Sequence, residues 1–405
     1  MSKKEKKKSN EPQEEIVLDI PEDEIWTYQI PGLAAPHINK PHSHYNLKKI
    51  IFVIVILIAV SLSMFFSVMA LKNEPFEYEV TDSGYKFTKF SNTGYIDELA
   101  IDYVSDIEYI PGNNNPENNF SIVKDETKPI IAVGEFTLNC DNKITKITIG
   151  ENVEFVDTKA FYSCWALQVI EVDENNPNYC DIDGVLYNKD KTEILCYPCD
   201  HDEYLRKKYN YEKEFFTEEI TKEYERDVQT YVVPSSVKKI GEMCFNYANL
   251  RTIYLPEGLE TIETLAIFKL HERKDEWNTT PSLANIFSYK GENVTDTHLK
   301  NKKDLGEIYN SLPEGLKYIG SDAFTYNQAL TYVYIPESVT YIGHHAFWDT
   351  VYKEDGNLKG VSVINVAVSE EVFENELEVG DNWNPQYDYF LFKKDIEIKY
   401  NAERE

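Results

Sequence analysis

Residues 316–324 read LKYIGSDAF and residues 339–347 read VTYIGHHAF, and variants of this nine-residue phrase recur along the chain. Each of the two phrases begins three residues after a proline, contains an Ile-Gly pair and ends on an Ala-Phe pair. Recurrence at a fixed period of this kind is the sequence signature of a repeat protein, in which every copy forms one structural unit.

The same frame runs through six copies. Its apolar positions lie three, six and eleven residues after a proline in four copies and after Gly150 in a fifth, and the copy before that one has Val133 and Leu138 at the last two positions. The last of these positions is held in turn by Leu138, Phe161, Phe245, Ile267, Phe324 and Phe347. One copy cannot bury such side chains alone, whereas stacked copies bury them in a continuous core. The chain is therefore predicted to form a β-rich solenoid with coils of 22–23 residues.

Each coil is expected to contain two short strands. An alternating segment precedes the proline, as in residues 330–336 (LTYVYIP) and 250–256 (LRTIYLP). Alternation of apolar and polar residues indicates a half-buried strand, and a proline ends its hydrogen-bond ladder. The Ile-Gly segment is the second extended piece, and its glycine would permit a turn with positive φ. The Ala-Phe pair is expected on a short helical or 3₁₀ turn.

These phrases resemble the BspA-like leucine-rich repeat family. The resemblance is carried by residues 237–241 (VKKIG), by both nine-residue phrases, and by residues 173–198 (DENNPNYCDIDGVLYNKDKTEILCYP). It implies a fold of leucine-rich repeats and a protein that is secreted or displayed on the cell surface. It also implies a class of proteins of which some adhere to, or bind, proteins of a host.

The segments around the repeats divide the chain further. Leucine-rich repeats are expected over residues 124–352, with interruptions at 201–227 and 269–309. The first interruption lacks Gly and Pro and has apolar residues near one helical face, which predicts a surface helix or a helical hairpin. The second is polar and is expected to be a loop-rich excursion. Residues 72–123 and 353–405 are expected to cap the two ends of the stack.

A membrane anchor is predicted near the N-terminus. The run from Ile50 to Leu71 reads IIFVIVILIAVSLSMFFSVMAL and contains no charge. At about 1.5 Å per residue, residues 50–71 span the ~30 Å core of a bilayer as one helix. Lysines, including Lys48 and Lys49, gather before this run. The positive-inside rule then places residues 1–49 in the cytoplasm, as a disordered tail, and the repeats outside the cell membrane.

Charge and motifs exclude several functions. The net charge is −29, which argues against nucleic-acid binding, because phosphates require basic patches. Nine of the 41 basic and eight of the 70 acidic residues lie in residues 1–72, so the remainder has a net charge of −30. The chain contains no G-x-S-x-G, H-E-x-x-H or phosphate-loop motif. Neither an enzyme activity nor a metal or cofactor site is predicted.

The alternating strands offer a candidate binding face. Its outward positions are Lys146, Thr148, Val169, Glu171, Thr252, Tyr254, Tyr332 and Tyr334. Tyrosine is large, fairly rigid and amphipathic, which suits contact with a protein partner. The same rings could instead stabilise the sheet as cross-strand neighbours. Tyr332 and Tyr334 are expected to be exposed, on either side of an inward Val333.

Cys180 and Cys199 are predicted to lie close enough to form a disulfide. A hairpin is predicted over residues 184–197, with its turn at 188–191. Folding about the centre of this hairpin places Cys180 across from Cys199. Direct cross-strand neighbours can bring their Cα atoms within the ~7 Å that a disulfide requires.

The sequence favours a membrane-anchored extracellular protein that acts as a surface binding or adhesion module. Its expected ligand is a protein or a component of the cell envelope. The alternative is a structural or assembly component of the envelope, which contacts a cytoplasmic partner through residues 1–49. An exported enzyme ranks third.

Overall fold

The computed structural model describes residues 76–91, 96–109, 120–138, 143–211, 217–273, 279–281, 283–298, 302–354, 357–385 and 397–404. All of them belong to one unit of the chain, Ala70–Glu405. The expected cytoplasmic tail (residues 1–49) and the expected membrane helix (50–71) lie outside the described residues. Within the described ranges, no helix combines the length and the apolar character that crossing a bilayer requires.

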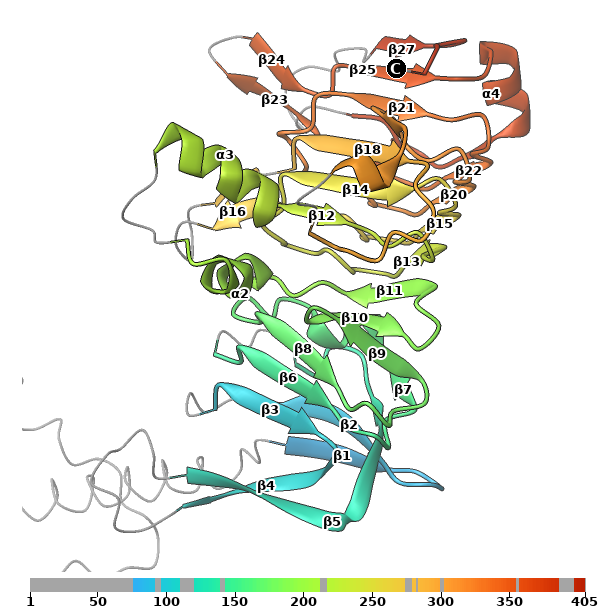
Figure 1. The fold of residues 1–405 in the computed structure, drawn as a ribbon. Helices are drawn as coiled ribbons and strands as arrows, with labels where there is room; N and C mark the ends of the chain where they lie inside the picture. The colour runs from blue at the N-terminus through green and yellow to red at the C-terminus, as the bar shows by residue number, and fades with distance from the viewer. Residues whose placement is uncertain are drawn as a thin grey trace, which may run out of the picture. The chain divides into compact units, whose positions relative to one another are not determined.

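The Ile-Gly segments pair in parallel, one copy on the next, along an eight-stranded sheet (Figure 1). In chain order its strands are β9 (Tyr179–Ile182), β10 (Val185–Asn188), β11 (Glu193–Cys196), β13 (Lys239–Ile240), β15 (Thr261–Ile262), β20 (Tyr318–Ile319), β22 (Tyr341–Ile342) and β26 (Glu378–Val379). The frame isoleucines face one another, Ile240 opposite Ile262 and Ile262 opposite Ile319. The predicted second strand of the coil is confirmed.

The alternating segments form three further sheets. The strands of the first are β3 (Glu98–Ile101), β6 (Lys146–Ile149) and β8 (Val169–Val172); of the second, β12 (Thr230–Val232), β14 (Thr252–Pro256), β18 (Asn285–Tyr289) and β19 (Ile308–Tyr309); of the third, β21 (Val333–Ile335), β25 (Val363–Val366) and β27 (Glu397–Lys399). All neighbours in these sheets run parallel except β18 and β19. Parallel pairing follows from the repeat, because every copy crosses the sheet in the same direction.

Other elements lie before, between and after these sheets. They are β1 (Phe76–Val80), β2 (Tyr85–Phe90), β4 (Tyr103–Tyr109), β5 (Phe120–Val133), β7 (Phe155–Val156), the 3₁₀ helix η2 (Thr158–Phe161), β16 (His271–Arg273), β17 (Thr279–Pro281), the 3₁₀ helix η3 (Lys302–Leu305), β23 (Val351–Glu354), β24 (Asn357–Gly360) and α4 (Glu370–Glu376). The Ala-Phe pair of one copy, Ala160 and Phe161, lies on η2 as predicted, and both side chains are buried.

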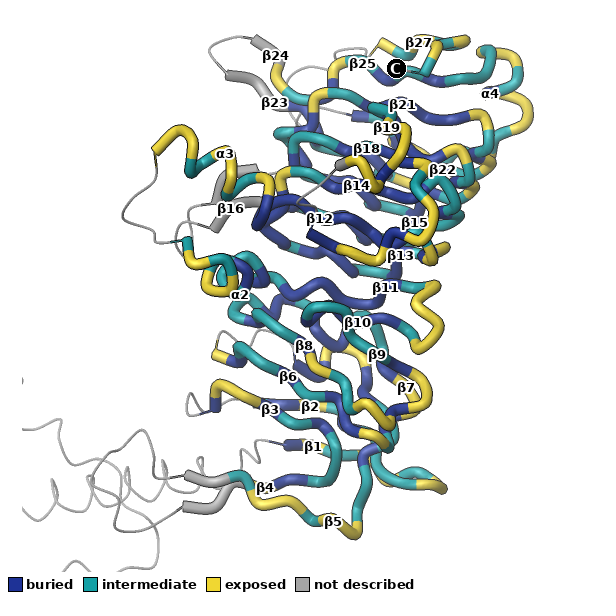
Figure 2. Tube along the Cα trace, viewed as in Figure 1, coloured by how far each residue is buried: buried dark blue, intermediate teal, exposed yellow. Residues whose placement is uncertain are grey.

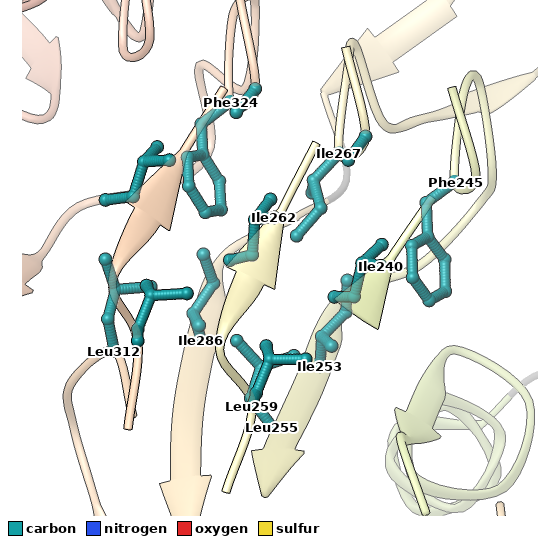
Figure 3. Packing of buried hydrophobic residues seen from close by; sticks show 14 of the residues in the cluster. Ile240, Phe245, Ile253, Leu255, Leu259, Ile262, Ile267, Ile286, Leu312 and Phe324 are labelled. Carbon is teal, nitrogen blue, oxygen red and sulfur yellow. The ribbon is translucent and has the colours of Figure 1, made fainter. Parts of the chain in front are cut away.

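The frame residues form the core. Side chains of adjacent copies, such as Ile240 and Ile262, lie next to one another in one layer (Figure 3). The rings of Phe324 and Phe347 stack with their centroids 4.9 Å apart and an interplanar angle of 3°. Buried residues line the inside of the stacked copies, and exposed residues gather at turns and on the helices (Figure 2). Continuous burial across copies is what stabilises a repeat that could not fold alone.

The glycine after the frame isoleucine has a different role from the predicted one. Neither Gly320 nor Gly343 has a positive φ. A Cβ atom on Gly343 would lie 2.4 Å from the backbone nitrogen of Ser321, in the preceding copy. A Cβ atom on Gly320 would lie equally close to the nitrogen of Thr264. Glycine is therefore required by the close approach of consecutive copies, and the predicted left-handed turn is wrong.

The two interruptions differ from each other. The first contains α2 (His201–Lys208) and α3 (Glu218–Asp227), which confirms its helical interpretation. Both helices lie on the same side of the repeats (Figure 1). The second is only partly an excursion, because β18 pairs in parallel with β14, Ile286 opposite Ile253. Ile286 is buried in the main core, so this polar segment still supplies a strand to the repeat sheet.

Candidate functional site

The N-terminal part of the predicted binding face is accessible. Lys146 and Thr148 on β6 lie opposite Val169 and Glu171 on β8. Glu171 is exposed and the other three are half-buried. The ammonium of Lys146 lies 2.7 Å from a carboxylate oxygen of Glu171, and this contact raises the pKa of Lys146. The surface is polar and internally paired, and an ion pair this exposed stabilises the fold by at most about 1 kcal/mol.

The C-terminal part of the same face is covered. Tyr254 and Tyr334 are only 2% and 4% exposed, so the prediction that Tyr334 is exposed is wrong. Thr252 and Tyr332 are half-buried, so Tyr332 is also less exposed than predicted. The strand register is nevertheless the predicted one, because Val333 belongs to the main core and Tyr334 does not.

Segments distant in sequence cover these tyrosines. Tyr254 stacks on Phe287 of β18 with ring centroids 5.3 Å apart, in a small apolar cluster that includes Leu305. The hydroxyl of Tyr334 donates a hydrogen bond of 3.4 Å to the carbonyl of Ala402 near the C-terminus. The outward side of a strand is thus a second core here, because the insertion and the C-terminal segment fold over it.

A buried polar cluster lies beneath α2. The side chains of His201 and His298 are both buried, and their ring centroids are 6.1 Å apart. The Nε2 atom of His298 lies 3.4 Å from a carboxylate oxygen of Asp183, and the Nδ1 atom of His201 lies 2.7 Å from the carbonyl of Gln168. Burial lowers the pKa of His201 to about 3 and also lowers that of His298, so both are neutral at pH 7. In the part of the chain that the structure describes, no three His, Cys, Asp or Glu side chains form a group suited to a metal.

Cys180 and Cys199 do not form the predicted disulfide. Both are free thiols. The hairpin of β10 and β11 exists, but a second hairpin folds β9 back, which places Cys180 opposite Tyr187. The thiol of Cys199 instead points to the carbonyl of Asn246, at 3.2 Å. The prediction treated β9 and β10 as one strand and missed the turn at Gly184, whose φ is +82°.

A row of aromatic side chains crosses the repeats on another surface. This aromatic row consists of Tyr162, Tyr247, Phe268, Tyr326 and Trp348, all half-buried. The distances between successive ring centroids are 6.4, 5.9, 5.6 and 5.4 Å. The last three contacts are edge-to-face, a favoured arrangement of aromatic rings. The row is therefore a continuous and partly open apolar surface that passes from copy to copy.

The aromatic row was missed because the predicted frame ended at its Phe position. Members of the row stand one or two residues after that position, as Tyr162 follows Phe161 and Tyr326 follows Phe324 by two. The offset alternates between one and two residues from copy to copy. An aromatic residue within two positions of the frame, repeated in five copies, is the signal that would have found it.

Comparison with known protein families identifies the type of these repeats. Residues 90–183, 223–354 and 292–376 match the model of the BspA type leucine rich repeat region, in six copies. These residues make up more than half of the chain. No curated protein matches the sequence.

Several solved structures are similar at low identity. A leucine-rich repeat protein from Eubacterium ventriosum is 18% identical, with 60% of this chain and 49% of that chain covered and a TM-score of 0.36. The pneumococcal vaccine antigen PcpA is 19% identical, with 61% and 56% covered and a TM-score of 0.34. A leucine rich cell surface protein from Faecalibacterium prausnitzii is 15% identical, with 78% and 94% covered and a TM-score of 0.26. The chain spans about half the length of the first two.

Proposed function

Because the chain belongs to the BspA-type leucine-rich repeat family, we propose that it is a surface binding or adhesion module for a protein or a component of the cell envelope. The aromatic row supports this proposal most directly, because it presents five half-buried rings in a continuous line. Aromatic residues are enriched at interfaces, where a ring buries a large area with little loss of conformational freedom. We also propose that the copies form one solenoid, capped by residues 72–123 and 353–405.

The proposed module is held outside the cell by a single membrane helix, residues 50–71. The uncharged run and the lysines before it support this arrangement, with residues 1–49 in the cytoplasm. The part outside would carry the net charge of −30, which favours solubility and repels anionic surfaces. The proposed role is non-catalytic, because the sequence contains no G-x-S-x-G or H-E-x-x-H motif and His201 and His298 are buried beneath the surface.

A capture experiment tests the binding role. Residues 73–405 are immobilised and incubated with envelope and host extracts. The triple variant Phe268→Ala, Tyr326→Ala and Trp348→Ala should lose the proteins that the unchanged chain retains. The matched variant Lys146→Ala with Glu171→Ala, on the other surface, should retain them. Equal capture by all three proteins would contradict a binding role for the aromatic row.

The assembly role remains the alternative. It is supported by residues 25–31 (IWTYQIP), an apolar stretch in an otherwise polar tail that could bind a cytoplasmic partner. Deletion of residues 1–49 distinguishes the two roles if display of the repeats on the cell surface is measured in parallel. Loss of function with intact display would favour assembly, and retained capture would favour the binding module.

A further inference from the structure

One cation already lies on the aromatic row. The ammonium of Lys269 is 5.6 Å from the ring centroid of Tyr247 and 5.7 Å from that of Tyr326. The face of an aromatic ring carries negative potential, so both rings attract a cation at this distance. Lys269 stands two residues after the frame position of its copy, where Tyr247 and Tyr326 stand in theirs. The chain thus places a positive charge of its own between two members of the row.

The backbone holds these three side chains in fixed positions. Tyr247, Lys269 and Tyr326 all adopt positive φ, at 61°, 51° and 64°. The backbone N–H of Lys269 donates to the carbonyl of Thr325 at 3.0 Å, and that of Tyr326 donates to the carbonyl of Trp348 at 3.1 Å. These bonds link each turn to the next copy. The rings are therefore arranged before any ligand arrives, which lowers the entropic cost of binding.

The charge around the row complements a basic ligand. Asp322 lies 3.7 Å from His345, whose ring packs against Trp348 at one end of the row. Glu135 is exposed at the other end, 3.9 Å from the ammonium of Lys159 and next to Phe136, whose ring packs edge-to-face on Tyr162. Residues 73–405 carry a net charge of −30 in addition. An anionic ligand would be repelled from such a surface, and a neutral sugar would gain nothing from its charge.

We propose that the aromatic row binds the Lys and Arg side chains of a basic, extended segment of a partner protein. Lys269 occupies one of the positions in the free protein and imitates such a side chain. This inference rests on the proposed binding function and names the chemistry of the partner. Copies stacked in register would let successive basic side chains of one segment contact successive rings.

The test uses the full chain in detergent micelles and a labelled octapeptide of alternating Lys and Ser, with a Glu-Ser octapeptide as control. Binding is measured by fluorescence anisotropy in about 150 mM salt. At this ionic strength the Debye length is about 8 Å, so charges farther apart than this are largely screened. The variant Tyr326→Leu with Trp348→Leu leaves the net charge unchanged, so any loss reports on the rings alone. The expected loss of affinity for the Lys-Ser peptide is at least about fivefold. Restoring one ring, with Tyr326→Phe and Trp348→Leu, should recover part of it.

A second variant keeps the test decisive if the double variant folds poorly. Lys269→Met removes the resident cation but keeps an apolar side chain, and should raise affinity for the Lys-Ser peptide by about twofold or more. Lys222→Met, on α3, makes the same change in net charge and serves as its control. Circular dichroism verifies the fold of each variant.

The possible failures can be told apart. Unchanged peptide affinity in the folded leucine variant would show that net charge alone attracts the peptide and would overturn this inference. If the same variant still lost its captured envelope or host proteins, the proposed function would stand without it. Ring-dependent binding of a neutral oligosaccharide in place of the Lys-Ser peptide would also overturn the inference, in favour of a carbohydrate ligand.

Discussion

One or two positions along the chain decide whether an aromatic residue belongs to the core or to the surface. Phe324 is fully buried and stacks on Phe347, whereas Tyr326, two residues later, is half-buried in the aromatic row. The turn that separates them requires positive φ at Tyr326, a conformation that costs a side-chain-bearing residue about 1–2 kcal/mol. The stacking of neighbouring copies offsets this cost, because each turn hydrogen-bonds to the next.

Truncation of a core phenylalanine should be severe. The change Phe324→Ala leaves a cavity against Phe347 and should lower the free energy of unfolding by about 3–5 kcal/mol. Phe155→Ala is the matched control, because Phe155 is 54% exposed and its loss should cost no more than about 0.5 kcal/mol. Urea unfolding followed by circular dichroism measures both. Equal losses would contradict the division into core and surface positions.

The sequence correctly predicted the burial of residues whose surroundings recur in every copy. The inward isoleucines and phenylalanines of the frame are buried because every copy imposes the same contacts. The prediction that Tyr254 and Tyr334 lie on an open face was wrong, because β18 and the C-terminal segment cover them. No local sequence pattern connects those segments to the two tyrosines. The aromatic row could have been predicted from the sequence, since its members stand one or two residues after the last frame position of each copy.

Between elements, the spacing of consecutive copies depends on glycine. Gly343→Ala would place a methyl group 2.4 Å from the backbone of Ser321, which cannot move without separating two strands. We expect the free energy of unfolding to fall by about 1–3 kcal/mol. Gly258→Ala is the control, because its methyl group would meet only the flexible end of Lys238. Thermal unfolding of both variants measures the difference, and a Gly343→Ala variant as stable as Gly258→Ala would refute the close-packing explanation.

Docking of α2 on the repeats should respond to acid. An unfolded histidine binds a proton near pH 6.5, whereas burial lowers the pKa of His201 to about 3 and also lowers that of His298. Below about pH 6.5 the unfolded state therefore binds more protons, and the free energy of unfolding falls as pH falls, by up to about 1.4 kcal/mol per unit for each histidine. Asp202 opposes this, because burial raises its pKa to about 7, and its uptake of a proton stabilises the folded state as pH falls.

The two contributions are separated by substitution. His298→Gln should reduce the loss of stability between pH 7 and pH 5, and Asp202→Asn should increase it. Phe155→Ala, at an exposed position with no titratable group, should follow the unchanged protein. The measurement is urea unfolding at both pH values, compared as differences so that the cost of each substitution at neutral pH cancels. A His298→Gln variant with the same pH dependence as the unchanged protein would rule out this histidine as a source of acid sensitivity.

Elements that belong to the repeat were predictable, and those that interrupt it were predictable only in part. The helical periodicity of residues 201–227 identified α2 and α3 because each has an apolar stripe. The predicted register of β9 was wrong because a tight turn, with positive φ at Asp183 and Gly184, separates β9 from β10. Such a turn leaves little trace in the hydrophobic pattern. β18 was not predicted because only Ile286 of this short strand packs in the main core.

At the scale of the whole molecule, charge and hydrophobicity are divided between two parts of the chain. Residues 1–72 are nearly neutral and contain the uncharged run, whereas the remainder has a net charge of −30. The lysines that precede the run favour retention of the N-terminus in the cytoplasm, because positively charged flanks resist translocation. This asymmetry supports our proposal that the acidic repeats are exported, which the proposed binding role requires.

Protease treatment of intact cells tests this orientation. We expect added protease to remove an epitope tag placed at the C-terminus and to spare one placed at the N-terminus, because the bilayer would shield only residues 1–49. Lysed cells, in which both tags should be cleaved, are the control for accessibility. A variant with Lys40, Lys48 and Lys49 changed to Gln should show a larger fraction of inverted chains, since the charge difference across the run is reduced. Protection of the C-terminal tag in intact cells would remove the basis for both the adhesion role and an extracellular partner of the aromatic row.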